Sequence, residues 1–229
     1  MKARAIVALD VPNAAEAATL LERLGTEADF VKVGSELFAA EGAAMVRQLR
    51  ADHREVFLDL KWHDIPNTVR SAARIAATLN VQLVTVHASG GRAMLEAAVE
   101  GAGHTCGVMA VTVLTSLDSA SLGEALGRPI ASVQDEVLRL ADLARRAGAH
   151  GVVCSGAEAA AVRAAFGNTL RILIPGIRLA GGDRHDQARV VTPDDAVAAG
   201  ASYLVLGRAV TAATDPRETL AAVKRAIAG

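Results

Sequence analysis

The chain has 229 residues, of which 52% are hydrophobic, 21% are charged and 3% are aromatic, and its formal net charge is -1. A nearly neutral chain with few aromatic residues and no basic tract is not expected to be a general binder of nucleic acids or anionic membranes. This length can bury a large core, and we expect a single domain over residues 1–229 rather than about two smaller domains.

The first apolar run also bears on the setting of the protein. This run covers residues 5–9, before Asp10, and is too short for a signal peptide. No later apolar run approaches the length of a membrane span. Cys106 and Cys154 form no CxxC pattern, so reduced core thiols are expected rather than a disulfide or a metal site. We therefore expect a cytoplasmic protein that acts on a small molecule.

Eight apolar runs of strand length alternate with helical patterns along the chain. The expected strands cover residues 5–9, 30–33, 56–60, 83–86, 107–114, 151–154, 171–174 and 203–206. Helical patterns follow them up to residue 24, over 35–50, from 66, up to about 100, over 133–147, 157–166 and 193–199, and up to 228. Residues 117–132 are long for a strand-to-helix connection, so they either cover a site or contain a short extra helix.

This alternation, without a linker, predicts an α/β fold of the (β/α)8 TIM-barrel type. A doubly wound open sheet is the alternative, but no GxGxxG follows the first strand and no GxxxxGK precedes Ser or Thr. Active sites of such barrels lie at the carboxyl ends of the strands. At those ends this chain has polar residues, which are Asp10, Lys32, Asp59, Lys61, His87, Thr115, Arg178 and Arg208.

Two of these polar residues call for an explanation from the sequence alone. Lys32 lies inside an apolar strand, where it either snorkels to the surface or needs an anion, for which Asp59 or Asp64 is expected. His87 ends the fourth strand, and we expect it to satisfy a backbone group rather than to catalyse.

The densest pattern lies at residues 59–68, where a strand gives way to alternating charges and then to a helix that begins near Pro66. Asp59 and Lys61 are two apart and share a face, and Asp64 can fold back toward them from the loop. A lysine between carboxylates stays protonated, which suits it to stabilise developing negative charge and to donate a proton. The alternative is structural: Asp64 caps the helix, while Asp59 and Lys61 form an ordinary ion pair.

The ends of the last two strands predict a phosphorylated substrate. Barrel enzymes often hold a phosphate in the loops after strands seven and eight, and here those loops offer Arg178 after Gly176, and Arg208 after Gly207. The alternative is that Gly207 only ends a strand and that Arg208 pairs with a helix carboxylate. Residues 179–189 are polar and contain two glycines, and we expect them to form a lid.

Residues 59–68, DLKWHDIPNT, closely resemble the signature of the orotidine 5'-monophosphate decarboxylase family. The resemblance extends over essentially the whole chain, through VALD at 7–10, KVG at 32–34, VHASGG at 86–91, VTVLTS at 111–116, PGIR at 175–178, DQAR at 186–189 and GR at 207–208. No functional position departs from it. DxKxxD alone is less specific, since related barrels share it, but its continuation as IPNT is highly specific.

The resemblance implies a cofactor-free conversion of orotidine 5'-monophosphate to UMP and CO2 in de novo pyrimidine biosynthesis. It implies a catalytic charge network of Lys32, Asp59, Lys61 and Asp64. Lys61 would protonate C6 of the pyrimidine, and Asp64 would enter the site of the neighbouring subunit of a homodimer. It also implies substrate contacts: Asp10 and Lys32 at the ribose, Thr115 and Ser116 at the pyrimidine, Arg178, Gln187, Gly207 and Arg208 at the phosphate, and further contacts from Asp59 and Thr68.

Three other functions remain possible on the sequence. A related barrel with DxKxxD could be a sugar-phosphate decarboxylase or aldolase that needs Mg2+. A non-catalytic nucleotide-binding barrel is disfavoured, because alternating buried charges are unfavourable to maintain without a use. A purely structural barrel would leave the two arginines and the glycine-bearing loop at one barrel end unexplained.

Overall fold

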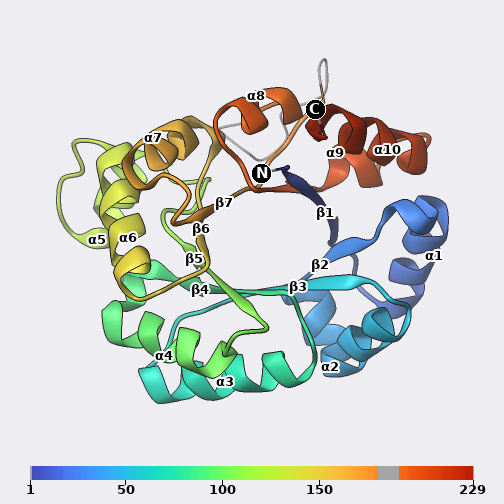
Figure 1. The fold of residues 1–229 in the computed structure, drawn as a ribbon, viewed down its shortest axis with the longest axis horizontal. Coiled ribbons are helices and arrows are strands. Elements are labelled where there is room, and N and C mark those ends of the chain that lie inside the picture. Colours follow the sequence, from blue (N-terminus) through green and yellow to red (C-terminus); the bar gives the residue numbers. More distant parts are fainter. Residues whose placement is uncertain (1, 180–190, 229) are drawn as a thin grey trace.

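The computed structural model describes residues 2–179 and 191–228. Eight parallel strands form a closed barrel in the order of the sequence, and β1 pairs with both β2 and β8 to close the ring. Helices surround the ring of strands on all sides (Figure 1). The predicted fold class, a (β/α)8 TIM barrel, is confirmed.

The strands follow the predicted apolar runs. They are β1 (Arg4–Leu9), β2 (Phe30–Gly34), β3 (Glu55–Trp62), β4 (Leu83–His87), β5 (Gly107–Val111), β6 (Gly151–Val153), β7 (Arg171–Ile174) and β8 (Tyr203–Leu206). The helices are α1 (Ala14–Leu24), α2 (Ser35–Ala51), α3 (Pro66–Thr78), α4 (Arg92–Ala102), α5 (Ser119–Leu126), α6 (Val133–Arg146), α7 (Gly156–Phe166), α8 (Pro193–Ala198), α9 (Arg208–Thr211) and α10 (Pro216–Ile227).

Three elements differ from the sequence-based expectation or resolve it. β5 ends at Val111, three residues before the predicted end, and the Thr112 side chain then donates a hydrogen bond to the Val153 carbonyl. The long connection after β5 contains the short extra helix, α5, which Asp118 caps. The four-residue helix α9 was not predicted, because one turn is too short to show a helical period.

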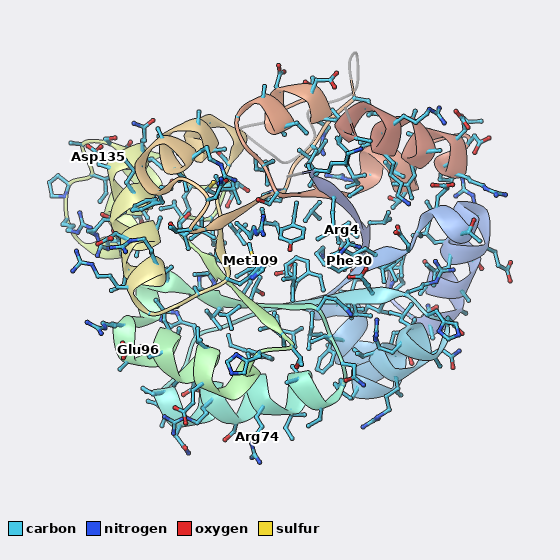
Figure 2. All side chains as sticks on the ribbon, in the orientation of Figure 1. Arg4, Phe30, Arg74, Glu96, Met109 and Asp135 are labelled. Atoms are coloured by element: carbon cyan, nitrogen blue, oxygen red, sulfur yellow. The ribbon has the colours of Figure 1, made fainter. Side chains whose placement is uncertain are left out.

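Two hydrophobic cores follow from the alternation of side chains along each strand. One core fills the barrel and includes Phe30, Phe57 and Met109. The other lies between the strands and the surrounding helices. Figure 2 shows Phe30 and Met109 inside the ring of strands, whereas Arg74 and Glu96 lie on the outer helices.

Helix starts fix where the strand-to-helix loops end. Asn13 caps α1, Ser132 caps α6 and Asp215 caps α10, each by accepting a hydrogen bond from a backbone N–H of the first turn. Pro66 occupies the first turn of α3, as the sequence predicts, because its fixed φ and missing N–H suit that position. These starts hold the loops at the carboxyl rim of the barrel.

Both cysteines are free and buried, as predicted. Burial raises the pKa of the Cys106 thiol to about 12, so it is an unreactive core group. Among the helices of the described residues, none has the length and apolar character needed to cross a membrane.

Candidate active site

A cavity of about 430 Å³ opens at the carboxyl ends of the strands. Eight of the residues that the sequence singled out line it together: Asp10, Lys32, Asp59, Lys61, Thr115, Arg178, Gly207 and Arg208. Its apolar floor is part of the barrel core and includes Phe57, Leu173 and Val205. The topology therefore gathers charges from five strands at one rim.

The side-chain alternation explains why these charges face inward. Phe30 and Phe57 point into the barrel, so Lys32 and Asp59, two residues further along the same strands, face the same way one layer higher. Lys32 and Asp59 are both buried. Such polar groups are tolerated there because they pair with each other and with neighbours at the rim.

The charges form a chain of alternating sign. Lys61 Nζ lies 2.8 Å and 2.9 Å from the two carboxylate oxygens of Asp59. Lys32 Nζ lies 2.6 Å from Asp10 Oδ1 and 3.7 Å from Asp59 Oδ2. The order across the site is therefore Asp10, Lys32, Asp59, Lys61, and the Lys61 ammonium stands at the open end with its side chain 39% exposed.

The expected partners of Lys32 need correction in part. Asp59 is a partner, but Asp10 is the nearer one, because β1 and β2 are adjacent strands that pair Ala8 with Lys32. Within the described residues of this chain, Asp64 makes no ion pair; it accepts a hydrogen bond from the backbone N–H of Ile65 at 2.6 Å. β3 continues to Trp62 and carries Asp64 past the rim, where it is exposed.

The structural alternative for Asp64 also fails. Ile65 is the N-cap of α3, and no side chain caps this helix. Asp64 is therefore neither a helix cap nor a member of the network in its own chain.

Lys61 has an unusual backbone conformation. Its φ is +50°, a left-handed value that few residues other than glycine adopt. The pairing of β3 with β4 shifts register between Leu58 and Trp62, so Lys61 lies in an irregular stretch of the ladder. Asp59 and Lys61 do meet, but through this irregularity rather than through the regular strand geometry that the sequence suggested.

Thr85 on β4 is a site residue that the sequence reasoning missed. Its hydroxyl contacts the Asp59 carboxylate and the Lys61 backbone, each at 2.9 Å. The available signal was the alternation along β4, since Thr85 shares the inward face with Leu83, and a polar group there is as unusual as Lys32 is on β2.

The phosphate-binding prediction rests on two arginines and two glycines. Arg178 is buried and lines the cavity; its backbone N–H donates to the Val191 carbonyl at 3.0 Å. Gly176 before it has a φ of +75°, a turn that favours glycine. Arg208 begins α9 after Gly207, and the side-chain position of Gly207 faces open space.

The remaining predicted residues lie elsewhere or are not described. Thr68, in the first turn of α3, and Ser116 are exposed and do not line the cavity. Gln187 and the predicted lid beyond Leu179 lie outside the described residues.

His87 lies next to the network with a different contact from the one expected. Its ring centre is 5.5 Å from that of His63, and no hydrogen bond joins it to the backbone of the described residues. Burial, together with the nearby His63 and Lys61 charges, lowers the pKa of His87. The imidazole is therefore held in its neutral form more strongly than in a free peptide.

A second cavity, also of about 430 Å³, opens at the amino ends of the strands. Four of its polar side chains pair with each other: Arg4 binds Glu55 at 2.6 Å, and His150 lies 3.2 Å from the Tyr203 hydroxyl. The open charges are at the other end, where barrel enzymes have their active sites. Over the part of the chain that the structure describes, no group of three or more His, Cys, Asp or Glu is arranged to hold a metal ion.

Comparison with protein families and curated proteins gives consistent matches. A model described as "Orotidine 5'-phosphate decarboxylase / HUMPS family" matches residues 3–223. The orotidine 5'-phosphate decarboxylase of Laribacter hongkongensis is 51% identical over 227 residues, covering 97% of this chain and 92% of that protein. The protein of the same name from Anaeromyxobacter sp. is 52% identical, covering 98% and 96%.

Solved structures agree. The crystal structure of orotidine 5'-phosphate decarboxylase from Lactobacillus acidophilus has a TM-score of 0.88 at 36% identity over 100% of both chains. That of the Pyrococcus horikoshii OT3 enzyme has a TM-score of 0.78 at 26% identity, over 99% of this chain and 100% of that chain. With the match over residues 3–223, the resemblance drawn from the signature at 59–68 is confirmed. The chain belongs to the orotidine 5'-phosphate decarboxylase / HUMPS family.

Proposed function

We propose that this chain is a carboxy-lyase that converts orotidine 5'-monophosphate to UMP and CO2, the last step of de novo UMP synthesis. It acts in the cytoplasm as one catalytic domain over residues 1–229, without a cofactor or metal. The observation that carries the proposal is the Lys61 ammonium, held by both oxygens of Asp59 in a cavity that also contains Arg178 and Arg208. A cation and a phosphate clamp in one cavity suit a phosphorylated substrate that develops negative charge.

The chemistry requires a positioned cation. When the bond between C6 of the pyrimidine and its carboxylate breaks, CO2 leaves and the electron pair stays on C6 in the plane of the ring. The ring's π system cannot delocalise that pair, so an adjacent ammonium must stabilise it. Lys61 does so and then transfers a proton to C6, which gives UMP. The neutral amine regains its proton from solvent.

The other residues of the cavity orient the substrate. Arg178, Gly207 and Arg208 bind the phosphate together with Gln187. Asp10 and Lys32, joined at 2.6 Å, bind the ribose hydroxyls, and Thr115 and Ser116 bind the pyrimidine. Binding of the phosphate thereby positions C6 next to the Lys61 ammonium. In this way contacts remote from the reacting bond increase the rate of decarboxylation.

Asp64 and Thr68 act across a homodimer interface. Both are exposed and lie at the start of α3, beside an Ile65 side chain that is 67% exposed. An apolar side chain next to two unused polar groups suits a surface that a second copy covers. Asp64 of one subunit then enters the site of the other and extends its charge network next to Lys61.

The reaction is tested by the ultraviolet absorbance of orotidine 5'-monophosphate mixed with purified protein and excess EDTA. The protein is prepared from a host that lacks its own decarboxylase. We expect conversion to UMP. Turnover of a sugar phosphate that appears only with added Mg2+, without conversion of the nucleotide, would instead identify the related decarboxylase or aldolase. The relatives from Laribacter hongkongensis and Anaeromyxobacter sp. both bear the orotidine 5'-phosphate decarboxylase name, which favours the nucleotide over a sugar phosphate as the substrate.

The role of Lys61 is tested by Lys61→Ala. Turnover should fall by at least about 100- to 10,000-fold, the usual contribution of a positioned general acid, because the variant also loses the cation that stabilises C6. Lys2→Ala, at an exposed lysine that precedes β1 at the amino end of the barrel, opposite the cavity, is the matched control and should turn over normally. Near-normal turnover by Lys61→Ala would contradict the mechanism.

A further inference from the structure

Thr85 occupies a buried position between the two residues to which the mechanism assigns the chemistry. It is 1% exposed and lies in the middle of β4, the strand next to β3. Its hydroxyl lies 2.9 Å from Asp59 Oδ1 and 2.9 Å from the Lys61 backbone nitrogen. A buried hydroxyl with two such partners calls for an explanation beyond packing.

The directions of both hydrogen bonds are fixed by chemistry. The Lys61 N–H can only donate, so the Thr85 oxygen accepts from it. The ionised Asp59 carboxylate can only accept, so the single Thr85 hydrogen points at Oδ1. The hydroxyl therefore has one orientation, in which it donates one hydrogen bond and accepts another.

The same hydroxyl compensates for the irregular pairing of β3. Along β3 the chain advances from Leu58 to Trp62 while β4 advances only from Val84 to Val86. The Lys61 N–H lies within this mismatch and finds the Thr85 hydroxyl in place of a β4 carbonyl. A left-handed lysine persists only where its surroundings over-determine it, and this bond holds the residue at its φ of +50°.

We propose that Thr85 is a positioning residue for the decarboxylation. It holds the Lys61 backbone in place. It also orients the Asp59 carboxylate, whose two oxygens lie 2.8 Å and 2.9 Å from Lys61 Nζ. The Thr85 hydroxyl oxygen thus positions the Lys61 backbone directly and the Lys61 ammonium through Asp59. The inference rests on the roles proposed above for Asp59 and Lys61.

The test compares Thr85→Val, which keeps the shape but removes the hydroxyl, with Thr85→Ser, which keeps the hydroxyl. For Thr85→Val we expect kcat on orotidine 5'-monophosphate to fall about 10- to 100-fold, the usual effect of misplacing a reacting group by about 1 Å, with little change in KM. Thr85→Ser should restore most of kcat. A loss of packing alone would not produce this separation of kcat from KM together with rescue by serine.

Thr112→Val is the matched control. Thr112 is also buried, and its hydroxyl donates a hydrogen bond to the Val153 carbonyl on β6 rather than to the charge network. The variant loses that hydrogen bond only. We expect it to keep kcat near the wild-type value. Wild-type kcat in Thr85→Val, or an equal loss of kcat in Thr112→Val and Thr85→Val, would overturn the inference.

A crystal structure of Thr85→Val gives a readout that is independent of activity. The Lys61 backbone should leave its left-handed conformation, or the Asp59 carboxylate should rotate away from Lys61 Nζ. If Asp59 and Lys61 keep their arrangement in the variant, the inference is overturned, whatever the activity of the wild type. Failure of the wild type to decarboxylate the nucleotide would refute the proposed function instead. If Thr85→Val does not fold, Thr85→Ala, which adds no methyl group against Asp59, takes its place in both measurements.

Discussion

At the scale of single residues, His87 beside the charge network has a pKa that its surroundings lower. His87 lies half-buried at the end of β4, with the His63 ring 5.5 Å away. Burial is the main reason that its pKa is lowered, and the charges of His63 and then Lys61 add to the effect. A protonated His87 would place another cation next to Lys61, and the lowered pKa of His87 disfavours that second positive charge.

This lowered pKa predicts a pH dependence of stability. Unfolded His87 binds a proton near its ordinary pKa of about 6.5, whereas folded His87 binds one only at lower pH. The unfolded state therefore binds more protons as the pH falls through that range, and the free energy of unfolding decreases. In His87→Asn this component is lost, so the advantage of the wild type over the variant should shrink as the pH falls from about 8 to about 5.

Urea denaturation at several pH values measures the effect. His53→Asn is the matched control, because His53 is exposed and its φ of +60° is one that asparagine accepts. If the two variants differ from the wild type with the same dependence on pH, the interpretation of His87 is wrong.

At the scale of elements, the turn from β2 to α2 is shaped by the ion pair beneath it. Gly34 is the last residue of β2 and the N-cap of α2. A Cβ at this position would lie 2.9 Å from Lys32 Nζ and 3.2 Å from Asp10 Oδ1. The glycine is therefore required by the close approach of the pair, since its φ of -92° is open to any residue.

Gly34→Ala should displace Lys32 from Asp10 without unfolding the helix. Because these two side chains are proposed to hold the ribose, we expect kcat/KM on orotidine 5'-monophosphate to fall about 10- to 100-fold. Steady-state kinetics measure this, with circular dichroism as a check on folding. Ser35→Ala, at the exposed next position, is the control for effects on the start of α2. Equal kinetics in both variants would show that the turn tolerates a side chain.

At the scale of the whole molecule, a single barrel places three of the four residues of the proposed catalytic network, Lys32, Asp59 and Lys61, in one cavity. The cavity contains Asp10, Lys32, Asp59 and Lys61, but Asp64 of the same chain is exposed at the start of α3. A second copy that supplies its Asp64 would complete the alternating network. In the proposed mechanism, a homodimer would therefore complete the charge network as well as cover the exposed Ile65.

Mixing two impaired variants tests whether the site is shared between two copies. Lys61→Ala and Asp64→Ala are each expected to be weakly active, but in a mixed dimer one site receives both native residues. Random pairing of equal amounts places about one quarter of the sites in that native state, so about that share of activity should return. Lys61→Ala mixed with Lys32→Ala is the control, because both of those residues act within one chain and no site becomes complete. Failure of the first mixture to recover, or recovery in both, would refute the shared site.

The sequence determined the barrel and the chemistry at its rim. Alternating apolar runs and helical patterns predicted all eight strands, because each strand and helix must bury one face and the strands are long enough to show it. The apolar runs place the carboxyl ends of the strands closely, although β5 ends earlier than its run, so the carboxyl-end location of Asp59, Lys61 and Arg178 was predictable. The signature at residues 59–68 then gave the family.

Only the tertiary structure decided which of these groups touch. Lys32 pairs most closely with Asp10, because the register between β1 and β2 brings the two together, and that register is set by closure of the whole barrel. Thr85 reaches Lys61 only because β3 and β4 fall out of register beside it. A sequence states which face a residue is on, but the distance between residues on different strands depends on how all eight strands tilt and close.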